Sequence, residues 1–217
     1  MDKRIQVDTE NFVLNLTCAN RVEIQDYFAE IKLNKEFYDR IEENQRVSSG
    51  IRNSSWNFSI GETLGAVLYA ICRKQKPEVV VETGVASGVS SSFILCALEQ
   101  NKHGQLCSID LPWWQDYESG WRIPNYLRHR WHLIQGKSSK TLLPLLEKIA
   151  EVDIFLHDSD HTYQNMLWEY RTVWKYLKPR GLLLSHNIDT NDAFSDFCHS
   201  SGVRGYSPTN MGGTAKD

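Results

Sequence analysis

The sequence lacks any cysteine motif, because its cysteines are odd in number and scattered along the chain. The chain has 217 residues and five cysteines, and none of the cysteines forms a CxxC pair. An odd, scattered set argues against a disulfide framework and against a structural zinc site. Cys72, Cys96 and Cys107 stand among apolar residues, so we expect them to be small residues of a hydrophobic core.

Long apolar segments and excess positive charge are also missing. No run approaches the roughly 20 residues that cross a bilayer, and the N-terminus, MDKRIQVDTENFVLNLTC, lacks the apolar stretch of a signal peptide. The net charge is −3, so no overall field attracts nucleic acid or a membrane surface. We therefore expect a cytoplasmic protein with neither of these partners.

A regular alternation of two patterns begins near residue 77. Short apolar runs predict strands, and segments with helical spacing separate them, which indicates βαβ units and a parallel sheet covered on both faces. The sequence therefore predicts an α/β fold, a Rossmann-like doubly wound, mostly parallel seven-stranded sheet with helices on both faces. The predicted strands are residues 79–82, 106–109, 132–134, 154–156 and 182–185, with weaker ones at 203–207 and 212–215. The predicted helices between them are residues 90–100, 123–129, 139–150 and 163–177.

The part of the chain before residue 77 lacks this alternation and predicts helices. Residues 20–46 carry apolar side chains at helical spacing among many charges, which predicts one or two amphipathic helices. A polar loop with Trp56 and Phe58 follows, and residues 61–74 predict another helix. We divide the chain into an N-terminal helical cap, residues 1–59, and one globular domain, residues 60–217.

The segment VVVETGVASGVSSSF, residues 79–93, places Glu82 at the end of a predicted strand and small residues, Gly84, Ala86 and Gly88, after it. In such sheets ligands bind beyond the carboxyl ends of the strands. Small residues let a ligand approach the backbone, and the next helix begins with unpaired N–H groups. The spacing is E-x-G-x-A-x-G, which differs from the G-x-G-x-x-G fingerprint of dinucleotide-binding proteins.

A second carboxylate, Asp110, ends the next predicted strand. An acid at this place accepts hydrogen bonds from ribose hydroxyls. The carboxylate of Glu82 would repel a pyrophosphate and attract an ammonium group. Together the two acids indicate a cationic nucleoside, and S-adenosylmethionine fits because it has an ammonium, a sulfonium and a ribose.

Over residues 60–190 the sequence resembles the class I S-adenosylmethionine-dependent methyltransferases. Within them it is similar to small-molecule O-methyltransferases of the catechol type and to their cephalosporin-hydroxylase-like relatives. The resemblance implies methyl transfer from S-adenosylmethionine to a hydroxyl of a small molecule. It rests on five blocks in order, which are V-V-E-T-G-V-A-S-G, S-I-D-L-P, R-W-H-L-I-Q-G-K-S, F-L-H-D-S-D-H-T-Y and L-K-P-R-G-L-L-L-S-H-N-I.

The resemblance also assigns the parts of the cofactor to residues. The small-residue turn would contact the methionine part, Asp110 would hold the ribose, and residues 136–138 would lie near the adenine. Lys137 stands where an acidic residue is common in the family, which leaves adenine recognition open. The cofactor-binding residues implied are Glu82, Gly84, Ala86, Gly88, Asp110, Gly136, Ser138 and Asp158.

The ends of the fourth and fifth predicted strands imply a divalent metal site. In catechol-type enzymes an aspartate after strand four and an aspartate–asparagine pair after strand five hold the metal. Asp158 and Asn187 match this pattern, whereas His186 replaces a carboxylate. Two hypotheses stay open. In one, these three residues bind Mg²⁺ or a transition metal, which imidazole suits better. In the other, no metal binds and His186 acts directly on the substrate.

His161 and Asp158 are the predicted catalytic residues. A lysine at the spacing of His161 is the general base in catechol-type enzymes, and an imidazole with a pKa near 6.5 could do the same near neutral pH. The alternative is that His161 caps the next helix or packs against Tyr163. We expect Asp160 to cap that helix and His157 to be structural.

Two other functions remain in view. One is a nucleotide-dependent oxidoreductase on the same sheet, and the other is a protein that binds the cofactor without catalysis. A nucleic-acid methyltransferase is disfavoured, because no N-P-P-Y or D-P-P-Y block follows the fourth strand. The expected partner is a hydroxylated small molecule, and the aromatic residues of 111–131 would suit the contact of a homodimer.

Overall fold

A single sheet of six strands organises the computed structural model, which describes residues 3–49, 61–112 and 118–217. The strand order is β3-β2-β1-β4-β5-β6; β1 to β5 are parallel, and β6 pairs antiparallel with β5. The direction of winding reverses between β1 and β4, so the switch point lies there. The strands are β1 (Val79–Thr83), β2 (Gln105–Asp110), β3 (Trp131–Gln135), β4 (Val152–His157), β5 (Leu177–Ser185) and β6 (Gly212–Ala215).

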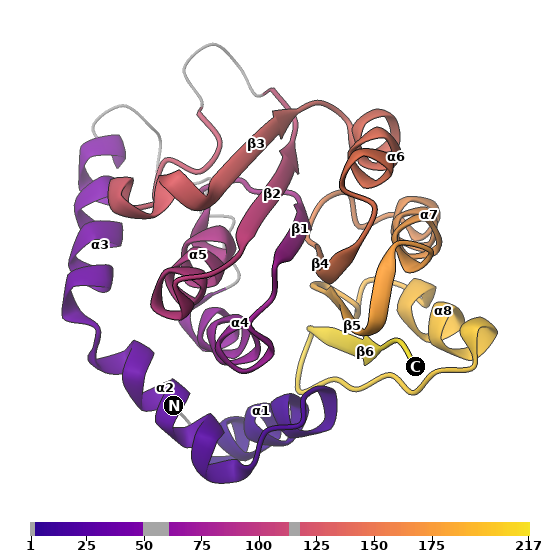
Figure 1. Ribbon diagram of the computed structural model, residues 1–217, viewed down its shortest axis with the longest axis horizontal. Coiled ribbons are helices and arrows are strands. Elements are labelled where there is room, and N and C mark those ends of the chain that lie inside the picture. Colours follow the sequence, from indigo (N-terminus) through magenta and orange to yellow (C-terminus); the bar gives the residue numbers. More distant parts are fainter. Residues whose placement is uncertain (1–2, 50–60, 113–117) are drawn as a thin grey trace.

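Helices cover both faces of the sheet (Figure 1). On one face α4 and α5 pack against the strands, with α1 and α2 outside α4, and on the other lie α6, α7 and α8. The helices are α1 (Lys3–Leu16), α2 (Arg21–Leu33), α3 (Lys35–Ser49), α4 (Gly61–Gln75), α5 (Val89–Asn101), α6 (Ser138–Ile149), α7 (Tyr163–Trp174) and α8 (Ala193–Ser201), with a 3₁₀ helix, η1 (Asn125–Arg130).

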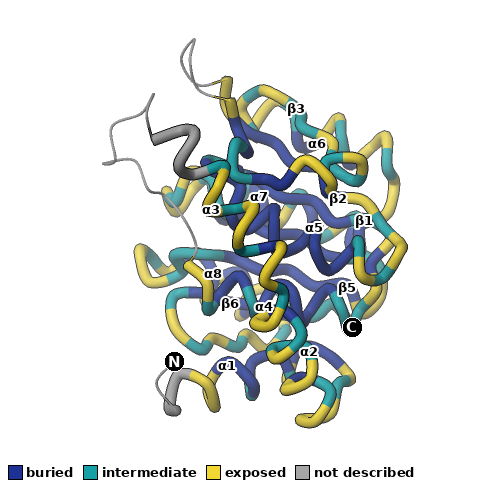
Figure 2. Tube along the Cα trace, turned by 90° about the vertical axis from the view of Figure 1, so that its left-hand side faces the viewer, coloured by how far each residue is buried: buried dark blue, intermediate teal, exposed yellow. Residues whose placement is uncertain are grey.

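The two-residue period of the strands divides the core in two. Val80 and Leu156 face α4 and α5, whereas their neighbours Val81 and Phe155 face α6 and α7, and all four are buried. The central strands are buried on both faces (Figure 2), as parallel strands require. The predicted core cysteines are confirmed, because Cys72, Cys96 and Cys107 are all buried free thiols.

The predicted α/β class is confirmed, with differences at the ends of the chain. The described residues contain six strands and not seven, because residues 203–207 form only an isolated bridge between Tyr206 and Gly213. Pro208 follows directly, and proline has no N–H for a ladder. Strand β5 begins at Leu177, where the sequence predicted helix. Helix α1 lies within the predicted helical cap, but its position was not predicted.

The N-terminal helices pack on the same core as α4 and α5. Phe12 of α1, Ile24 and Ile31 of α2 and Phe37 of α3 are all buried within it. Helix α2 begins with a capping box, in which Asn20 and Glu23 exchange side-chain-to-backbone hydrogen bonds. The division of the chain near residue 60 stays a prediction. Across the described parts of the chain, every helix is too short or too polar to cross a membrane.

Candidate active site

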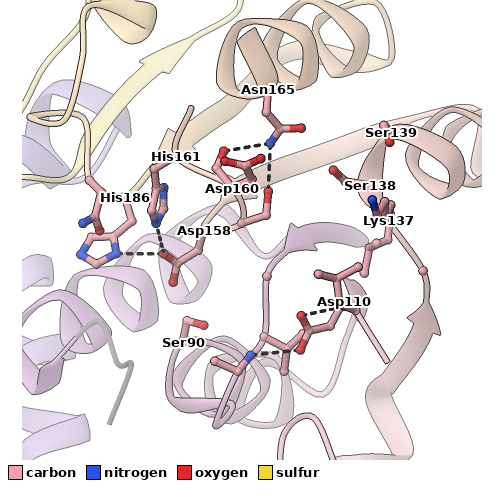
Figure 3. A pocket seen from close by; sticks show the side chains of 18 of the residues that line it. Ser90, Asp110, Lys137, Ser138, Ser139, Asp158, Asp160, His161, Asn165 and His186 are labelled. Carbon is pink, nitrogen blue, oxygen red and sulfur yellow. Dashed lines mark hydrogen bonds and ion pairs between the residues drawn. The ribbon is translucent and has the colours of Figure 1, made fainter. Parts of the chain in front are cut away.

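A cavity of about 850 Å³ opens at the carboxyl ends of β1, β2, β4 and β5. This is the switch point of the sheet, where α/β proteins of this type bind ligands. Figure 3 shows the two ends of the cavity, with Asp110 and Ser138 at one end and His161 and His186 at the other. The lining residues are Gly84, Val85, Ala86, Val89, Ser90, Ile109, Asp110, Leu111, Gly136, Lys137, Ser138, Ser139, Asp158, Ser159, Asp160, His161, Asn165, His186 and Asn187.

Gly84 allows the loop after β1 to touch the loop after β4. Its φ angle is 84°, and a Cβ atom at this position would lie 2.0 Å from the backbone oxygen of Asp158. The N–H of Asp158 in turn donates to the oxygen of Thr83 over 2.8 Å. Two loops that carry predicted site residues are therefore held in backbone contact.

Replacing Gly84 by alanine should combine a strained φ with a steric clash, and we expect it to cost about 2–5 kcal/mol of folding free energy. Gly202 is the matched control, because its φ is 69° and its added Cβ would have nothing within 4 Å. Gly202→Ala should therefore show the conformational cost alone, about 1 kcal/mol. Urea denaturation measures both, and equal losses would refute the contact between the loops.

A hydrogen bond joins Ala86, in the loop between β1 and α5, to the side chain of Asp110 at the end of β2. The N–H of Ala86 donates to Oδ2 of Asp110 over 3.2 Å, and Ser119 donates to the same oxygen over 2.6 Å. Oδ1 accepts from the N–H of Leu111 over 2.9 Å. A carboxylate has about four lone-pair sites, so Oδ1 keeps one for a ligand. Gly136 and Ser138 line the same end of the cavity, as predicted.

Glu82 lies beneath the cavity and does not line it. The side chain is fully buried, and its oxygens accept hydrogen bonds from Ser90, Ser91 and Ser108 at 2.5, 2.6 and 2.8 Å. The strand continues to Thr83, so alternation turns Glu82 toward α5. The expected direct contact with an ammonium group is therefore corrected. Gly88 precedes α5 as its N-cap and is not among the lining residues, so its contact with the cofactor stays a prediction.

Burial raises the pKa of Glu82 to about 7, although the three serine hydroxyls lower it in part. Unfolded, this group titrates near 4.5. The folded state therefore holds the proton more tightly, and the contribution of Glu82 to stability is full below pH 4.5 and is lost as the pH rises through 7. At about 1.4 kcal/mol per pH unit, the loss amounts to about 3 kcal/mol.

Glu82→Gln should remove this pH dependence, since glutamine stays neutral. We expect the unfolding free energy of the variant, relative to the wild-type protein, to increase by about 3 kcal/mol between pH 4.5 and pH 8. Urea denaturation of both proteins at several pH values measures the difference, in which the other titrating groups cancel. A difference that stays constant with pH would contradict the assignment.

The other end of the cavity is a cluster of Asp158, His161 and His186. Nδ1 of His186 lies 2.9 Å from Oδ1 of Asp158, and Nε2 of His161 lies 3.9 Å from the same oxygen. Both rings point toward this carboxylate in Figure 3. Burial lowers the pKa of His161, as do His157 and His186, whereas Asp158 and Asp160 act to raise it. His161 is therefore neutral at pH 7 and able to accept a proton.

The predicted metal ligands meet at this end, but the donor set fits a metal poorly. Nδ1 of His186 is hydrogen-bonded to Asp158, and its Nε2 lies 3.1 Å from Nδ2 of Asn210. Neither ring nitrogen therefore offers a free lone pair to a cation. In the described part of the chain no three His, Cys, Asp or Glu side chains are grouped as a metal site would need.

Sequence reasoning missed several residues of the cavity. One of them is Asn165, which donates to the backbone oxygen of Asp160 over 2.9 Å. Asn210, in the loop before β6, does not line the cavity but contacts the lining residue His186. Asp160 accepts from the N–H of Thr162 over 3.0 Å, but the N-cap of α7 is Thr162 and no side chain caps the helix, so the prediction that Asp160 caps it was wrong. The cap residues Arg52, Trp56 and Phe58 and the loop residues Trp113 and Trp114 lie outside the described residues.

Comparisons with known proteins agree with this fold. A family model described as "Methyltransferase domain" matches residues 81–188. The O-methyltransferase from Bacillus cereus, solved in complex with SAH, is 15% identical with a TM-score of 0.66, and the match covers 94% of this chain and 100% of that one. The methyltransferase PaMTH1 from Podospora anserina, bound to SAH, is 15% identical with a TM-score of 0.65 over 85% and 88% of the two chains.

A third similar structure is the O-methyltransferase TomG from Streptomyces achromogenes, which takes part in tomaymycin synthesis and was solved in complex with SAM. It is 15% identical with a TM-score of 0.62, and the match covers 82% of this chain and 90% of that one. A search of the curated proteins found no match. At these identities the solved structures establish the fold of the chain.

Proposed function

We propose that this chain, whose residues 81–188 match the family model described as "Methyltransferase domain", transfers the methyl group of S-adenosylmethionine to a hydroxyl of a small molecule. The observation that carries this proposal is the cavity itself. A carboxylate with a free lone pair, on Asp110, lies at one end, and a neutral imidazole, on His161, lies at the other. Three structures that are similar to this chain were solved with SAH or SAM bound.

The charges of the cavity favour a cationic donor. Asp110, Asp158 and Asp160 line it, against the single lysine Lys137. Methyl transfer converts the sulfonium of S-adenosylmethionine into the neutral thioether of S-adenosylhomocysteine. A negative cavity therefore attracts the donor more strongly than the product, which favours release after the reaction. Asp110 would accept a hydrogen bond from a ribose hydroxyl through its remaining lone pair.

At the other end His161 would serve as general base. As the acceptor oxygen attacks the methyl carbon, its O–H bond breaks, an N–H bond forms at Nε2 of His161, and the carbon–sulfur bond of the donor breaks. The imidazolium so formed lies 3.9 Å from Oδ1 of Asp158, whose negative charge stabilises it. His186 holds Asp158 in place through the 2.9 Å hydrogen bond.

We propose that this step needs no divalent cation, because His186 uses both ring nitrogens in hydrogen bonds. Turnover in buffer with excess EDTA should stay within about twofold of turnover with added Mg²⁺ or Mn²⁺. An activity that disappears with chelator and returns with one of these ions would contradict the proposal. It would show that Asp158 and Asn187 act as the metal ligands that the sequence predicted.

The test of the function is a titration followed by an assay. Calorimetry with S-adenosylmethionine should show micromolar binding, about −8 kcal/mol. Transfer of a labelled methyl group to a panel of phenols, catechols and sugars then identifies the acceptor. Binding without transfer to any acceptor would favour a protein that binds the cofactor without catalysis. Binding of NADH in its place would favour the oxidoreductase.

The homodimer and the cytoplasmic location remain proposals. Among the aromatic residues of 111–131, Tyr126 is 40% exposed, which suits a contact with a second copy, whereas Trp113, Trp114 and Tyr117 lie outside the described residues. Sedimentation of the purified chain would decide the oligomeric state.

A further inference from the structure

A second ionisable pair lies behind His161 and is completely buried. Nδ1 of His157, at the end of β4, lies 2.7 Å from Oε2 of Glu169 on α7, and both side chains have no exposed surface. Removing two ionisable groups from water costs free energy that a single contact seldom returns. The sequence predicted His157 to be structural, and nothing in the reaction described so far uses either residue.

The carboxylate of Glu169 accepts hydrogen bonds from four neighbouring side chains. In addition to His157, Thr83 donates to Oε2 over 2.6 Å, and Ser159 and Asn165 donate to Oε1 over 2.9 and 3.2 Å. These four donors occupy the lone pairs of the two oxygens. Burial acts to raise the pKa of Glu169, but the hydrogen bonds that it accepts, that from His157 above all, outweigh burial and lower the pKa. The ionised carboxylate can only accept, so the hydrogen shared with His157 is on Nδ1 of that ring.

The opposite nitrogen of His157 faces the cavity residue His161. Nε2 of His157 lies 3.3 Å from Nδ1 of His161, and the two rings meet edge to face. A neutral imidazole that carries its hydrogen on Nδ1 has a lone pair on Nε2. His157 therefore accepts a hydrogen bond from the Nδ1–H of His161. The hydrogen of His161 is thereby kept on Nδ1, which leaves the lone pair on Nε2, the nitrogen nearer Asp158 and the cavity.

We propose that Glu169 and His157 are positioning residues that fix the tautomer and the orientation of His161, so that its Nε2 is the proton acceptor in the methyl transfer. This inference rests on the proposed function. When Nε2 takes the proton of the acceptor hydroxyl, the Nδ1–H of the new imidazolium points at His157, and the carboxylate of Glu169 lies behind that ring. The proton on Nδ1 can then pass to Nε2 of His157, which breaks one N–H bond and forms another and leaves His161 neutral.

The series of contacts runs from Glu169 on α7, through His157 at the end of β4, to His161 in the cavity. The titratable groups that face His161 are Asp158 and Asp160 from its own loop, His157 from β4 and His186 from the end of β5. His157 alone among them contacts Nδ1. The tautomer of His161 therefore depends on His157, and through it on Glu169.

Nitrogen-15 NMR of histidine-labelled, full-length protein without substrate tests this directly. The expected spectrum shows His161 with its hydrogen on Nδ1 and an unprotonated Nε2, with the signals assigned by His161→Gln and His157→Gln. A hydrogen on Nε2 of His161 in the wild-type protein would overturn the inference. The tautomer is read in the free protein, so it decides this inference even when the proposed methyl transfer fails for want of an acceptor.

Glu169→Gln is the decisive variant, because it keeps the shape and loses the charge. An amide N–H in place of the carboxylate can donate to Nδ1 of His157, which reverses both tautomers. We expect a loss of the Nδ1–H form of His161 and a fall in kcat of ~10-fold or more, with the dissociation constant of S-adenosylmethionine within about twofold of the wild-type value. An unaltered tautomer would overturn the inference, whatever happens to kcat.

Glu10→Gln is the matched control for buried glutamate. Glu10 is 3% exposed and accepts from Arg21 and Gln25, but it lies on α1, away from the cavity lining. Both variants lose one buried carboxylate, so thermal unfolding shows whether each is folded at the assay temperature. A fall in kcat that Glu10→Gln reproduces would assign Glu169 to stability alone and would contradict its positioning role.

Discussion

Replacement of His161 by alanine is expected to lower kcat by about 10²- to 10⁴-fold, the usual contribution of a general base, while the affinity for S-adenosylmethionine stays within about twofold of the wild-type value. The reason is the position of the ring. It stands at the end of the cavity away from Asp110, it is neutral at pH 7, and its Nε2 lies beside Asp158 without a hydrogen bond to it.

His103→Ala is the control for this variant. His103 is exposed and lies just before β2, at the edge of the sheet opposite the cavity, so its loss should leave kcat unchanged. The pH profile gives a second readout. Burial lowers the pKa of His161, so kcat/KM should be flat near neutral pH and fall only in more acid solution, where the base becomes protonated. Turnover that survives in His161→Ala would assign the proton transfer to another group, with Asp158 as the first candidate.

Asp110→Ala is expected to weaken the binding of S-adenosylmethionine by about 2–3 kcal/mol, which is roughly 30- to 150-fold in the dissociation constant. The variant removes the acceptor for the ribose and also the anchor of the β1–α5 loop, since Ala86 and Ser119 both donate to it. Calorimetric titration measures the change. An affinity equal to that of the wild-type protein would mean that the donor binds elsewhere.

Asp153→Ala is a control of the same design. Asp153 lies near the start of β4 and accepts hydrogen bonds from the backbone N–H groups of Glu78 and Val79 at 2.9 and 2.8 Å. Like Asp110, Asp153 is an aspartate at one extremity of a strand, and its carboxylate anchors neighbouring backbone N–H groups. It stands at the amino ends of the strands, opposite the cavity, so its loss should reduce stability without changing the affinity for the donor.

The sequence predicted the sheet and the edge at which the cavity lies. Periodicity locates parallel strands, and parallel strands bring their carboxyl ends together, so Asp110, Asp158 and His186 could be placed at one site before any coordinates. The same reasoning could not decide toward which face of the sheet the side chain of a residue near the end of a strand points. Glu82 was assigned to the ligand because the sequence predicted it as the final residue of the strand, but the strand runs one residue further.

A signal for the buried carboxylates was nevertheless present. The three consecutive residues Ser90, Ser91 and Ser92 follow Glu82 at the start of a helix, and a buried acid needs such donors. Likewise Glu169 lies between Met166, Tyr170 and Val173 on the apolar side of α7, where a lone charge is stable only with a partner. The partner itself, His157, could not be identified from spacing, because the contact joins a strand to a helix through the tertiary structure.

The close approach of Gly84 to the backbone of Asp158 constrains how the enzyme can change over evolutionary time. The loop at the donor end and the loop that carries His161 are in van der Waals and hydrogen-bond contact through their main chains, so neither can lengthen or take a larger residue there without displacing the other. New acceptor specificities are therefore expected to arise through changes at other lining positions, such as Lys137 and Asn187. Changes there would leave the geometry of His161, His157 and Glu169 intact. The inner half of the site would be inherited as a fixed unit, and diversity would accumulate around it.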